Sequence, residues 1–452
     1  MRSVARRAWA LWCGILLLAG GMGYFLWSLY HEGETWVLHK GNPHLYAGAT
    51  GVAMGTVVDM QGQSLLRLTG GRVYASDPQI RCATMHWLGD RSGNVRGTVL
   101  QTYARELAGY SFAQGLYGYG GGGSTMELTL SAAVQAAALE AMGDYSGTVA
   151  VCNYRTGQIL CAVTTPTFDP DGTVGTQEGI FLNRFTQATY VPGSIFKIVT
   201  TAAALEYLPD AADITYNCDG SYYFGADRVT CERAHGRQDL AEALKNSCNC
   251  YFASLSEILG AAALEAYVVR SGVLESVRFD GIQTAQGNLQ IRGVAPVSLA
   301  WSAIGQHKDL INPCSFLTYV CAIANGGQGP LPYIVQRIYK GDRIYYTAQV
   351  TYGQRILSQE YAGMLTDFLR NNVENGYGQE SFPVGMTVCA KSGTGQVDGK
   401  KSYAMFVGFV LEERYPLAFL VAAEDAGYGK TVCMPIVAKV LQACKQVLDS
   451  QA

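Results

Sequence analysis

The sequence is poor in charge and has no excess of either sign. Charged residues make up 15% of its 452 positions, apolar residues make up 49%, and the formal net charge is −3. A protein that binds nucleic-acid phosphates carries a basic surplus, so this balance gives no support for nucleic acid as a partner. The apolar content is that of a globular chain, with enough buried surface for one large core or for a core and a smaller module.

Two common catalytic signatures are also missing. The chain contains no G-x-S-x-G, the turn that carries the serine of many hydrolases, and none of its six histidines pairs with a convincing serine. The nearest approach to a zinc-protease motif begins at His31 and Glu32, but it lacks the second histidine of H-E-x-x-H. A serine–histidine triad and a zinc protease are therefore unattractive explanations of this chain.

Charge is missing altogether between Ala8 and Tyr30. At about 1.5 Å per residue, a helix over this run would cross a hydrocarbon core of about 30 Å. The arginines that precede it predict a cytoplasmic N-terminus and an extracytoplasmic remainder. Ala19-Gly20-Gly21 offers the alternative of a cleaved signal peptide, but the apolar run continues beyond that site. We therefore predict that residues 1–30 form a cytoplasmic stub and an uncleaved single-pass anchor in the cell membrane.

Disulfides are the usual reason for many cysteines in an exported protein, and this chain has 13. Several lie in apolar runs and are predicted to be small buried side chains: Cys152, Cys161, Cys321 and Cys389. Cys218 and Cys231 instead flank a polar segment. A bridge between them stays an open alternative, because connectivity cannot be read from spacing.

Residues 31–123 combine short strand-like runs with a helical stretch near Thr98–Leu107, which indicates a small mixed module. The module ends in the glycine-rich segment Gly118–Gly123, which is typical of a hinge. Gly118, Gly120 and Gly123 match G-x-G-x-x-G. However, Met126–Leu130 looks like a strand where a nucleotide-binding helix should begin, so we do not predict a dinucleotide site.

In residues 124–452, strand-like hairpins lie near both ends and helices lie between them. The hairpins are predicted at Gly147–Asn153 with Gln158–Thr164 and at Tyr403–Val410 with Leu417–Ala423. Predicted helices are Ala132–Met142, Ile195–Tyr207, Leu240–Leu259, Pro313–Asn325 and the closing amphipathic helix Pro435–Leu448. This order predicts an α+β domain with an antiparallel sheet.

Ser194 opens a helical run, and Lys197 follows it by three residues. One helical turn brings both side chains onto the same face. A serine hydroxyl becomes a nucleophile when a base removes its proton, and a lysine amine can be that base once burial or nearby cations lower its pKa. The helix N-terminus also offers N–H groups to an oxyanion. Because S-x-x-K occurs by chance in a chain of this length, the pair needs further support.

A second motif, Ser247-Cys248-Asn249, lies in a segment of helical apolar periodicity. Ser247 could relay a proton and Asn249 could bind a substrate amide, because polar side chains here would be costly to bury without partners. A helix N-cap is the plain alternative for the serine.

The third motif, Lys391-Ser392-Gly393-Thr394, follows a predicted strand at Met386–Ala390. A cation and hydroxyls at a strand end can receive a carboxylate while the strand backbone aligns a peptide. A surface hairpin turn is the alternative. Each motif is weak alone, but S-x-x-K, S-x-N and K-[ST]-G-T in this order form a specific combination.

With these motifs the chain resembles the penicillin-binding proteins, and more particularly the class B-like transpeptidases without a glycosyltransferase domain. The likeness runs from about Met126 to the C-terminus and includes Leu128–Leu130, Gln135, Thr165–Pro170, Asn183-Arg184, Tyr190–Ser194, His235-Gly236, Ile304–Gln306, Ala324–Gly327 and Phe406–Phe409. It implies a five-stranded antiparallel sheet flanked by helices, the fold shared with serine β-lactamases. Residues 31–123 would then be a short pedestal or dimerisation-like module.

The resemblance also implies a role for each motif residue. Ser194 would be the acylated nucleophile, Lys197 its general base, and Ser247 the relay to the leaving amine. The implied substrate-binding set is Asn249, Lys391, Ser392, Gly393 and Thr394, with Thr394 on the terminal carboxylate. The backbone N–H groups of Ser194 and Thr394 would form the oxyanion hole.

The implied reaction is D,D-transpeptidation of peptidoglycan stem peptides, as part of cell-wall synthesis in cell shape or division. Ser194 attacks the D-Ala-D-Ala bond, D-Ala leaves, and the acyl group passes to a neighbouring stem's amine. β-Lactam antibiotics would acylate the same serine, and no metal or organic cofactor is implied. A SEDS-type glycan polymerase is a candidate partner.

The sequence departs from the family pattern at two places. Met60 follows Asp59 where the family commonly has arginine, and the pedestal is short, so the pedestal's contacts do not carry over. Cys248 and Cys250 are unusual near an extracytoplasmic site; buried thiols are the favoured interpretation, and a redox-sensitive pair is the alternative.

Two other functions share the acylation machinery. A carboxypeptidase or β-lactamase would let water deacylate the serine, and the anchored module favours the transferase over it. A non-enzymatic β-lactam or muropeptide sensor would need an intracellular output, and only the first seven residues precede the predicted span.

Overall fold

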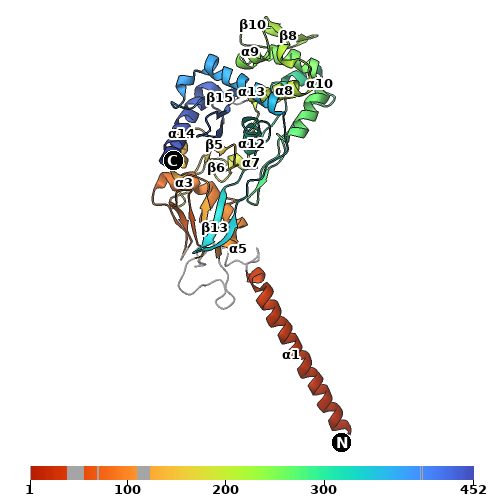
Figure 1. Cartoon of the computed structure of the whole chain (residues 1–452), viewed down its shortest axis with the longest axis vertical. Helices are drawn as coiled ribbons and strands as arrows, with labels where there is room; N and C mark the ends of the chain where they lie inside the picture. Colours follow the sequence, from red (N-terminus) through yellow and green to blue (C-terminus); the bar gives the residue numbers. More distant parts are fainter. Residues whose placement is uncertain are drawn as a thin grey trace.

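A computed structural model describes residues 2–37, 55–68, 71–108, 123–397, 399 and 401–451. The first element is α1 (Arg2–Val37), one continuous helix drawn apart from the folded remainder (Figure 1). Its segment Ser3–Gly33 is long and apolar enough to cross a membrane, with a mean hydropathy of 1.6 and no burial of its most apolar window. The predicted anchor from Ala8 to Tyr30 therefore lies wholly within one exposed apolar helix.

A five-stranded sheet forms the centre of the folded part. Its strands run in the order β15 (Val388–Gly395), β16 (Tyr403–Val410), β17 (Leu417–Ala423), β5 (Gly147–Asn153) and β6 (Ile159–Thr165). Every neighbouring pair is antiparallel. This confirms the predicted α+β fold with its five-stranded antiparallel sheet, and it makes β15, which carries the third motif, an edge strand.

Helices bury both faces of this sheet. On one face, Phe406 and Val421 lie in a cluster with α6 (Ala132–Met142) and α14 (Gly429–Gln451). On the other face, Val407 and Leu420 lie in the cluster that contains α8 (Lys197–Tyr207) and α12 (Pro313–Ala324). Successive strand residues point to opposite faces, so two buried faces require an unbroken apolar run.

A second sheet joins distant parts of the chain. Its order is β14 (Arg343–Thr347), β13 (Val335–Lys340), β4 (Thr125–Leu128), β1 (Thr56–Val58), β2 (Ser64–Arg67) and β3 (Val73–Tyr74). The predicted module boundary between residues 123 and 124 thus falls between strands of one sheet. The predicted hinge and G-x-G-x-x-G segment, Gly118–Gly123, lies outside the described residues except for Gly123.

Asp59 connects this second sheet to α6, which packs on the five-stranded sheet. The side chain is fully buried. Its Oδ1 accepts hydrogen bonds from the N–H groups of Gln61 and Gln63 at 2.9 and 2.8 Å, and its Oδ2 accepts from Ala132 N–H at 3.0 Å. The carboxylate therefore closes the turn after β1 and also caps the first turn of α6, where negative charge is favourable.

The predicted helix Leu240–Leu259 is wrong as a single element. It is instead α9 (Leu240–Lys245) followed by α10 (Asn249–Ser271), and residues 246–248 break the run. Ser247 adopts a left-handed conformation with φ 52°. Cys248, not Ser247, is the N-cap of α10, and its Sγ accepts from Tyr251 N–H at 3.3 Å. The S-x-N motif therefore occupies the break itself.

The remaining elements complete the fold. The predicted helix Thr98–Leu107 is two short helices, and α14 begins six residues before Pro435, which lies inside it. The other helices are α3 (Pro78–Leu88), α4 (Val99–Thr102), α5 (Ala104–Ala108), α7 (Arg184–Gln187), α11 (Pro296–Ala303) and α13 (Gln359–Asn372); the other strands are β7 (Tyr216–Cys218), β8 (Ser221–Phe224), β9 (Asp227–Thr230), β10 (Gly236–Gln238), β11 (Arg278–Phe279) and β12 (Ile282–Gln283).

Candidate active site

Ser194 and Lys197 are held together by the turn that precedes α8. Gly193–Phe196 forms a 3₁₀ turn, and Lys197 is the first residue of α8. Side chains three residues apart eclipse one another in a 3₁₀ turn. Accordingly, Lys197 Nζ lies 2.8 Å from Ser194 Oγ, a hydrogen bond between the predicted nucleophile and its predicted base.

The S-x-N motif surrounds the same amine. Lys197 Nζ lies 2.8 Å from Asn249 Oδ1, 3.2 Å from Ser247 Oγ and 3.1 Å from the Ser247 carbonyl oxygen. That carbonyl is available because the chain is not helical at Ser247. Asn249 Nδ2 donates to the Thr230 carbonyl at 2.9 Å, which fixes the orientation of its amide.

Lys391 reaches the site from β15. Its Nζ lies 3.2 Å from Ser247 Oγ and donates to the Ser392 carbonyl at 2.8 Å. The Ser247 hydroxyl is therefore in contact with both lysines. The structure brings all three motifs together, as their order in the sequence predicted.

Burial controls the charge of the two lysines, which are both fully buried. Burial lowers the pKa of Lys391 to about 7. Burial also lowers the pKa of Lys197 well below its ordinary value, and the nearby charge of Lys391 lowers it further. A neutral amine can then exist beside Ser194 near neutral pH, which a general base requires.

Glycines allow the Ser194 turn to pack directly against β15. Gly193 has a φ of 55°, and a Cβ there would lie 2.3 Å from the Thr394 carbonyl oxygen. A Cβ on Gly393 would lie 2.6 Å from the Pro192 carbonyl oxygen. These contacts leave no room for a side chain, so the two glycines set the distance between the nucleophile and the edge strand.

A cleft of about 750 Å³ opens over these groups. Of the predicted site residues, those that line it are Ser194, Ser247, Asn249, Ser392 and Thr394, while Lys197 and Lys391 are buried beneath it. The edge of β15 thus runs along a cleft that has the paired serine and lysine at its floor.

Two residues that support the site were not assigned roles from the sequence. Tyr377 accepts a hydrogen bond from Ser392 N–H at 2.9 Å, and its hydroxyl lies 2.9 Å from Ser392 Oγ. Gln306 donates to the Thr394 carbonyl at 2.7 Å and accepts from Gln396 N–H at 3.0 Å. Tyr377 braces β15 from the segment that precedes the strand, and Gln306 braces it from a segment remote in the sequence. Gln306 falls in a stretch that resembles the family, but the sequence gives no signal for Tyr377.

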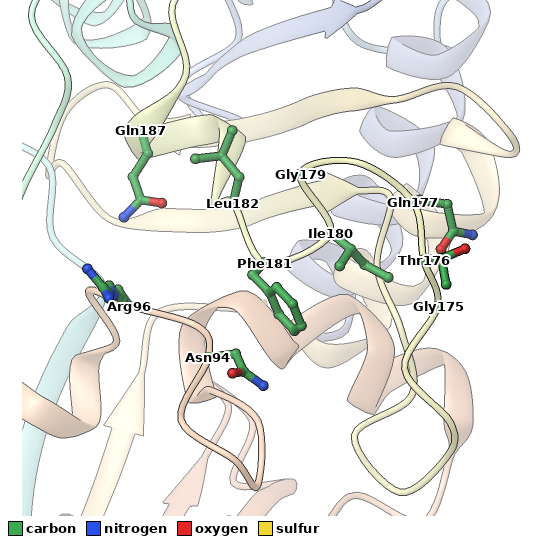
Figure 2. Close-up of a pocket in the computed structure, with 10 residues that line it drawn as sticks. All are labelled: Asn94, Arg96, Gly175, Thr176, Gln177, Gly179, Ile180, Phe181, Leu182 and Gln187. Carbon is green, nitrogen blue, oxygen red and sulfur yellow. The ribbon is translucent and has the colours of Figure 1, made fainter.

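A second pocket, of about 500 Å³, has different chemistry. Figure 2 shows its lining side chains, which come from the segment after α3 and from residues 175–187. Arg96 is the only ionisable side chain among them. This pocket has no nucleophile paired with a base, so the cleft at Ser194 is the better candidate for catalysis.

Comparison with known proteins identifies the family of this chain. Residues 147–442 match the family described as the penicillin-binding protein transpeptidase domain. Stage V sporulation protein D of Bacillus subtilis (strain 168) is 30% identical over 345 residues, which cover 71% of this chain and 53% of that protein. Peptidoglycan D,D-transpeptidase PbpA of Mycobacterium tuberculosis (strain H37Rv) is 26% identical over 387 residues, which cover 77% of this chain and 78% of that protein.

Solved structures share the fold. The D,D-transpeptidase domain of a peptidoglycan glycosyltransferase from Eggerthella lenta aligns with a TM-score of 0.76 at 24% identity, covering 87% of this chain and 98% of that one. The ceftriaxone acyl-enzyme complex of penicillin-binding protein A from M. tuberculosis aligns with a TM-score of 0.75 at 23% identity, covering 86% and 98%. With the matched family domain covering well over half of its length, this chain belongs to the family of penicillin-binding protein transpeptidases.

Proposed function

We propose that this chain is a serine-type D,D-transpeptidase that cross-links peptidoglycan stem peptides through an acyl-enzyme on Ser194. The observation that carries the proposal is the 2.8 Å contact between Ser194 Oγ and a buried lysine amine with a lowered pKa, at the floor of a cleft bordered by an edge strand. Membership of the family supports the same activity.

Acylation begins with proton transfer from Ser194 Oγ to neutral Lys197 Nζ. The oxygen attacks the carbonyl carbon between the two terminal D-alanines, and the N–H groups of Ser194 and Thr394 hold the oxyanion. The amine of the leaving D-Ala must gain a proton. Ser247 Oγ contacts both lysines and so provides a path for that proton out of Lys197. The C–N bond then breaks and D-Ala leaves.

Transfer follows the same path in reverse. The amine of a second stem attacks the ester carbonyl, gives up a proton to Lys197, and Ser194 regains its hydroxyl as the ester bond breaks. No redox step or net proton change is required. The donor stem would lie along β15 as an added strand, with its carboxylate near Lys391 and Thr394 and its backbone near Asn249.

The first test uses labelled penicillin on the purified full-length chain. We expect a covalent adduct that Ser194→Ala abolishes, because the substitution removes the hydroxyl that accepts the acyl group. Ser92→Ala, an exposed serine outside the cleft, is the matched control and should label like the wild type. Undiminished labelling of Ser194→Ala would disprove the assignment.

A second measurement separates transfer from hydrolysis. A donor pentapeptide supplied with an amine acceptor should give a cross-linked product. Free tetrapeptide as the sole product would favour a carboxypeptidase, and turnover of penicillin itself would favour a β-lactamase.

We also propose that α1 anchors the chain by a single pass, with the catalytic domain outside the cytoplasm. The length and hydropathy of α1 and the arginines at its start support this arrangement. A SEDS-type glycan polymerase is the proposed partner, and membership of the transpeptidase family is what supports it.

A further inference from the structure

Three cysteines and a histidine converge beside the S-x-N motif. Cys218 ends β7, Cys231 and His235 lie between β9 and β10, and Cys248 lies in the break between α9 and α10. Their four potential ligand atoms all lie within 4.8 Å of one another. Cys218 and Cys248 are buried, and the other two are half-buried. The proposed acyl-transfer mechanism uses none of them.

Three of the six separations match a tetrahedron around one metal ion, and the other three are at most 4.8 Å. Sγ of Cys231 lies 3.8 Å from Sγ of Cys218 and 3.7 Å from Sγ of Cys248, and Sγ of Cys218 lies 3.6 Å from Nδ1 of His235. With zinc bonds of about 2.3 Å to sulfur and about 2.1 Å to nitrogen, tetrahedral geometry puts two sulfurs about 3.8 Å apart and a sulfur and a nitrogen about 3.6 Å apart. A disulfide would need about 2.05 Å.

The backbone around the cluster favours thiolates. Tyr251 N–H donates to Cys248 Sγ and Cys250 N–H donates to Cys231 Sγ, both at 3.3 Å. Such donors stabilise the deprotonated sulfur that a metal requires. The strand pair β7 and β10 also holds His235 next to Cys218, through a hydrogen bond from His235 N–H to the Cys218 carbonyl at 3.1 Å.

We propose that Cys218, Cys231, His235 and Cys248 bind one zinc ion, and that this ion fixes the S-x-N loop in the active-site cleft. Thiolate and imidazole ligands in a tetrahedron select zinc over the harder cations. Four protein ligands leave no position for water, so the ion is structural and takes no part in the acyl transfer. This differs from the sequence-based expectation that the chain needs no metal.

The ion would affect catalysis by holding the loop that carries Ser247 and Asn249 in position. Cys248 lies between Ser247 and Asn249, and both of these contact Lys197 Nζ. Anchoring the Cys248 sulfur to β7 and to the segment after β9 restrains a loop in which Ser247 holds a left-handed conformation. Ser247 and Asn249 are catalytic and binding residues under the proposed function, whereas the four ligands are positioning residues.

Elemental analysis of the full-length chain, purified in detergent without added metal, tests the site directly. We expect about one zinc per chain, as for a closed structural site. Cys218→Ser and His235→Ala should each lower that content. Cys82→Ser, which removes a half-exposed thiol on α3, and Cys250→Ser, which removes the adjacent thiol outside the tetrahedron, should retain it. Cobalt substituted for zinc should show sulfur-to-cobalt charge transfer and the visible bands of a tetrahedral site.

The positioning role of the four metal ligands is tested by the rate of penicillin labelling. Removing zinc with a chelator should slow labelling by penicillin about ten- to a hundredfold, and added zinc should restore the rate. An unchanged labelling rate in zinc-free protein would overturn the positioning role. Zinc-free wild-type protein, or a disulfide from Cys231 to Cys218, Cys248 or Cys250 in the natively purified chain, would overturn the site. Metal content does not depend on acylation, so this result stands apart from the test of Ser194.

Discussion

At the scale of single residues, two buried amines of the candidate active site meet at one hydroxyl. Nζ of Lys197 and Nζ of Lys391 each lie 3.2 Å from Ser247 Oγ. Two ammonium groups this close to one oxygen repel each other, and burial disfavours the charge on both. We therefore expect Lys197 to lose its proton more readily than an ordinary lysine, which leaves a neutral amine for Ser194.

This arrangement predicts the effect of Lys391→Gln on pH dependence. The substitution removes a positive charge that lowers the pKa of Lys197, so that pKa should rise. Only neutral Lys197 accepts the Ser194 proton. In the plot of labelling rate against pH, the rise on the acidic side should therefore move to higher pH. Rapid-quench labelling with penicillin across the neutral range measures this rise. Tyr377→Phe, which leaves Lys391 in place, is the control. If the rise in labelling rate occurs at the same pH in Lys391→Gln as in the wild type, the prediction is contradicted.

The site residues were predictable because the three motifs have a fixed order and each carries its own chemistry. The supporting residues were not. Tyr377 is one of 28 tyrosines, and only the folded contact with Ser392 distinguishes it. The metal ligands were missed for a similar reason, since Cys218 and Cys231 gave no sign that Cys248 would lie 3.7 Å from Cys231.

At the scale of elements, the close packing of the Ser194 turn on β15 predicts different costs for two glycine substitutions. Gly225 has a φ of 64° with open space around its Cβ direction, so Gly225→Ala should cost about 1 kcal/mol from backbone strain alone. Gly193→Ala adds a clash with the Thr394 carbonyl and should cost roughly 2–4 kcal/mol.

Chemical denaturation and labelling by penicillin check this pair. Gly193→Ala should also lose most of its labelling, because Ser194 must move away from β15, while Gly225→Ala should label normally. Equal losses of stability in the two variants would show that the approach to β15 is not what requires glycine at position 193.

Element boundaries were predictable where local signals agreed. The strands β5, β16 and β17 have the predicted ends, because apolar runs stop there at polar turn segments. The break between α9 and α10 was not predictable, since neither glycine nor proline marks residues 246–248 and the apolar periodicity continues across them. At the break, Asn246 is the C-cap of α9, and Cys248 starts α10 as an N-cap whose sulfur accepts from Tyr251 N–H.

At the scale of the whole molecule, the proposed topology predicts where each part of the chain is found. The full chain should stay with the membrane fraction after an alkaline wash, and a variant lacking residues 1–37 should not, because among the described residues α1 is the one candidate span that is not partly buried in the fold. Protease added to intact spheroplasts should digest the catalytic domain. Protection of that domain would contradict the predicted orientation, and a mature mass lacking residues 1–21 would favour the signal peptide.

The second sheet constrains how the chain can reach its native state. β4 pairs with β1 on one side and with β13 on the other, and Val335 of β13 lies opposite Leu128. During synthesis, the edge of β4 that will pair with β13 therefore stays unpaired until most of the chain has been made. The second sheet therefore cannot be completed before most of the chain has been synthesised, and a nascent chain released before β13 would carry an unpaired strand edge that is prone to aggregation.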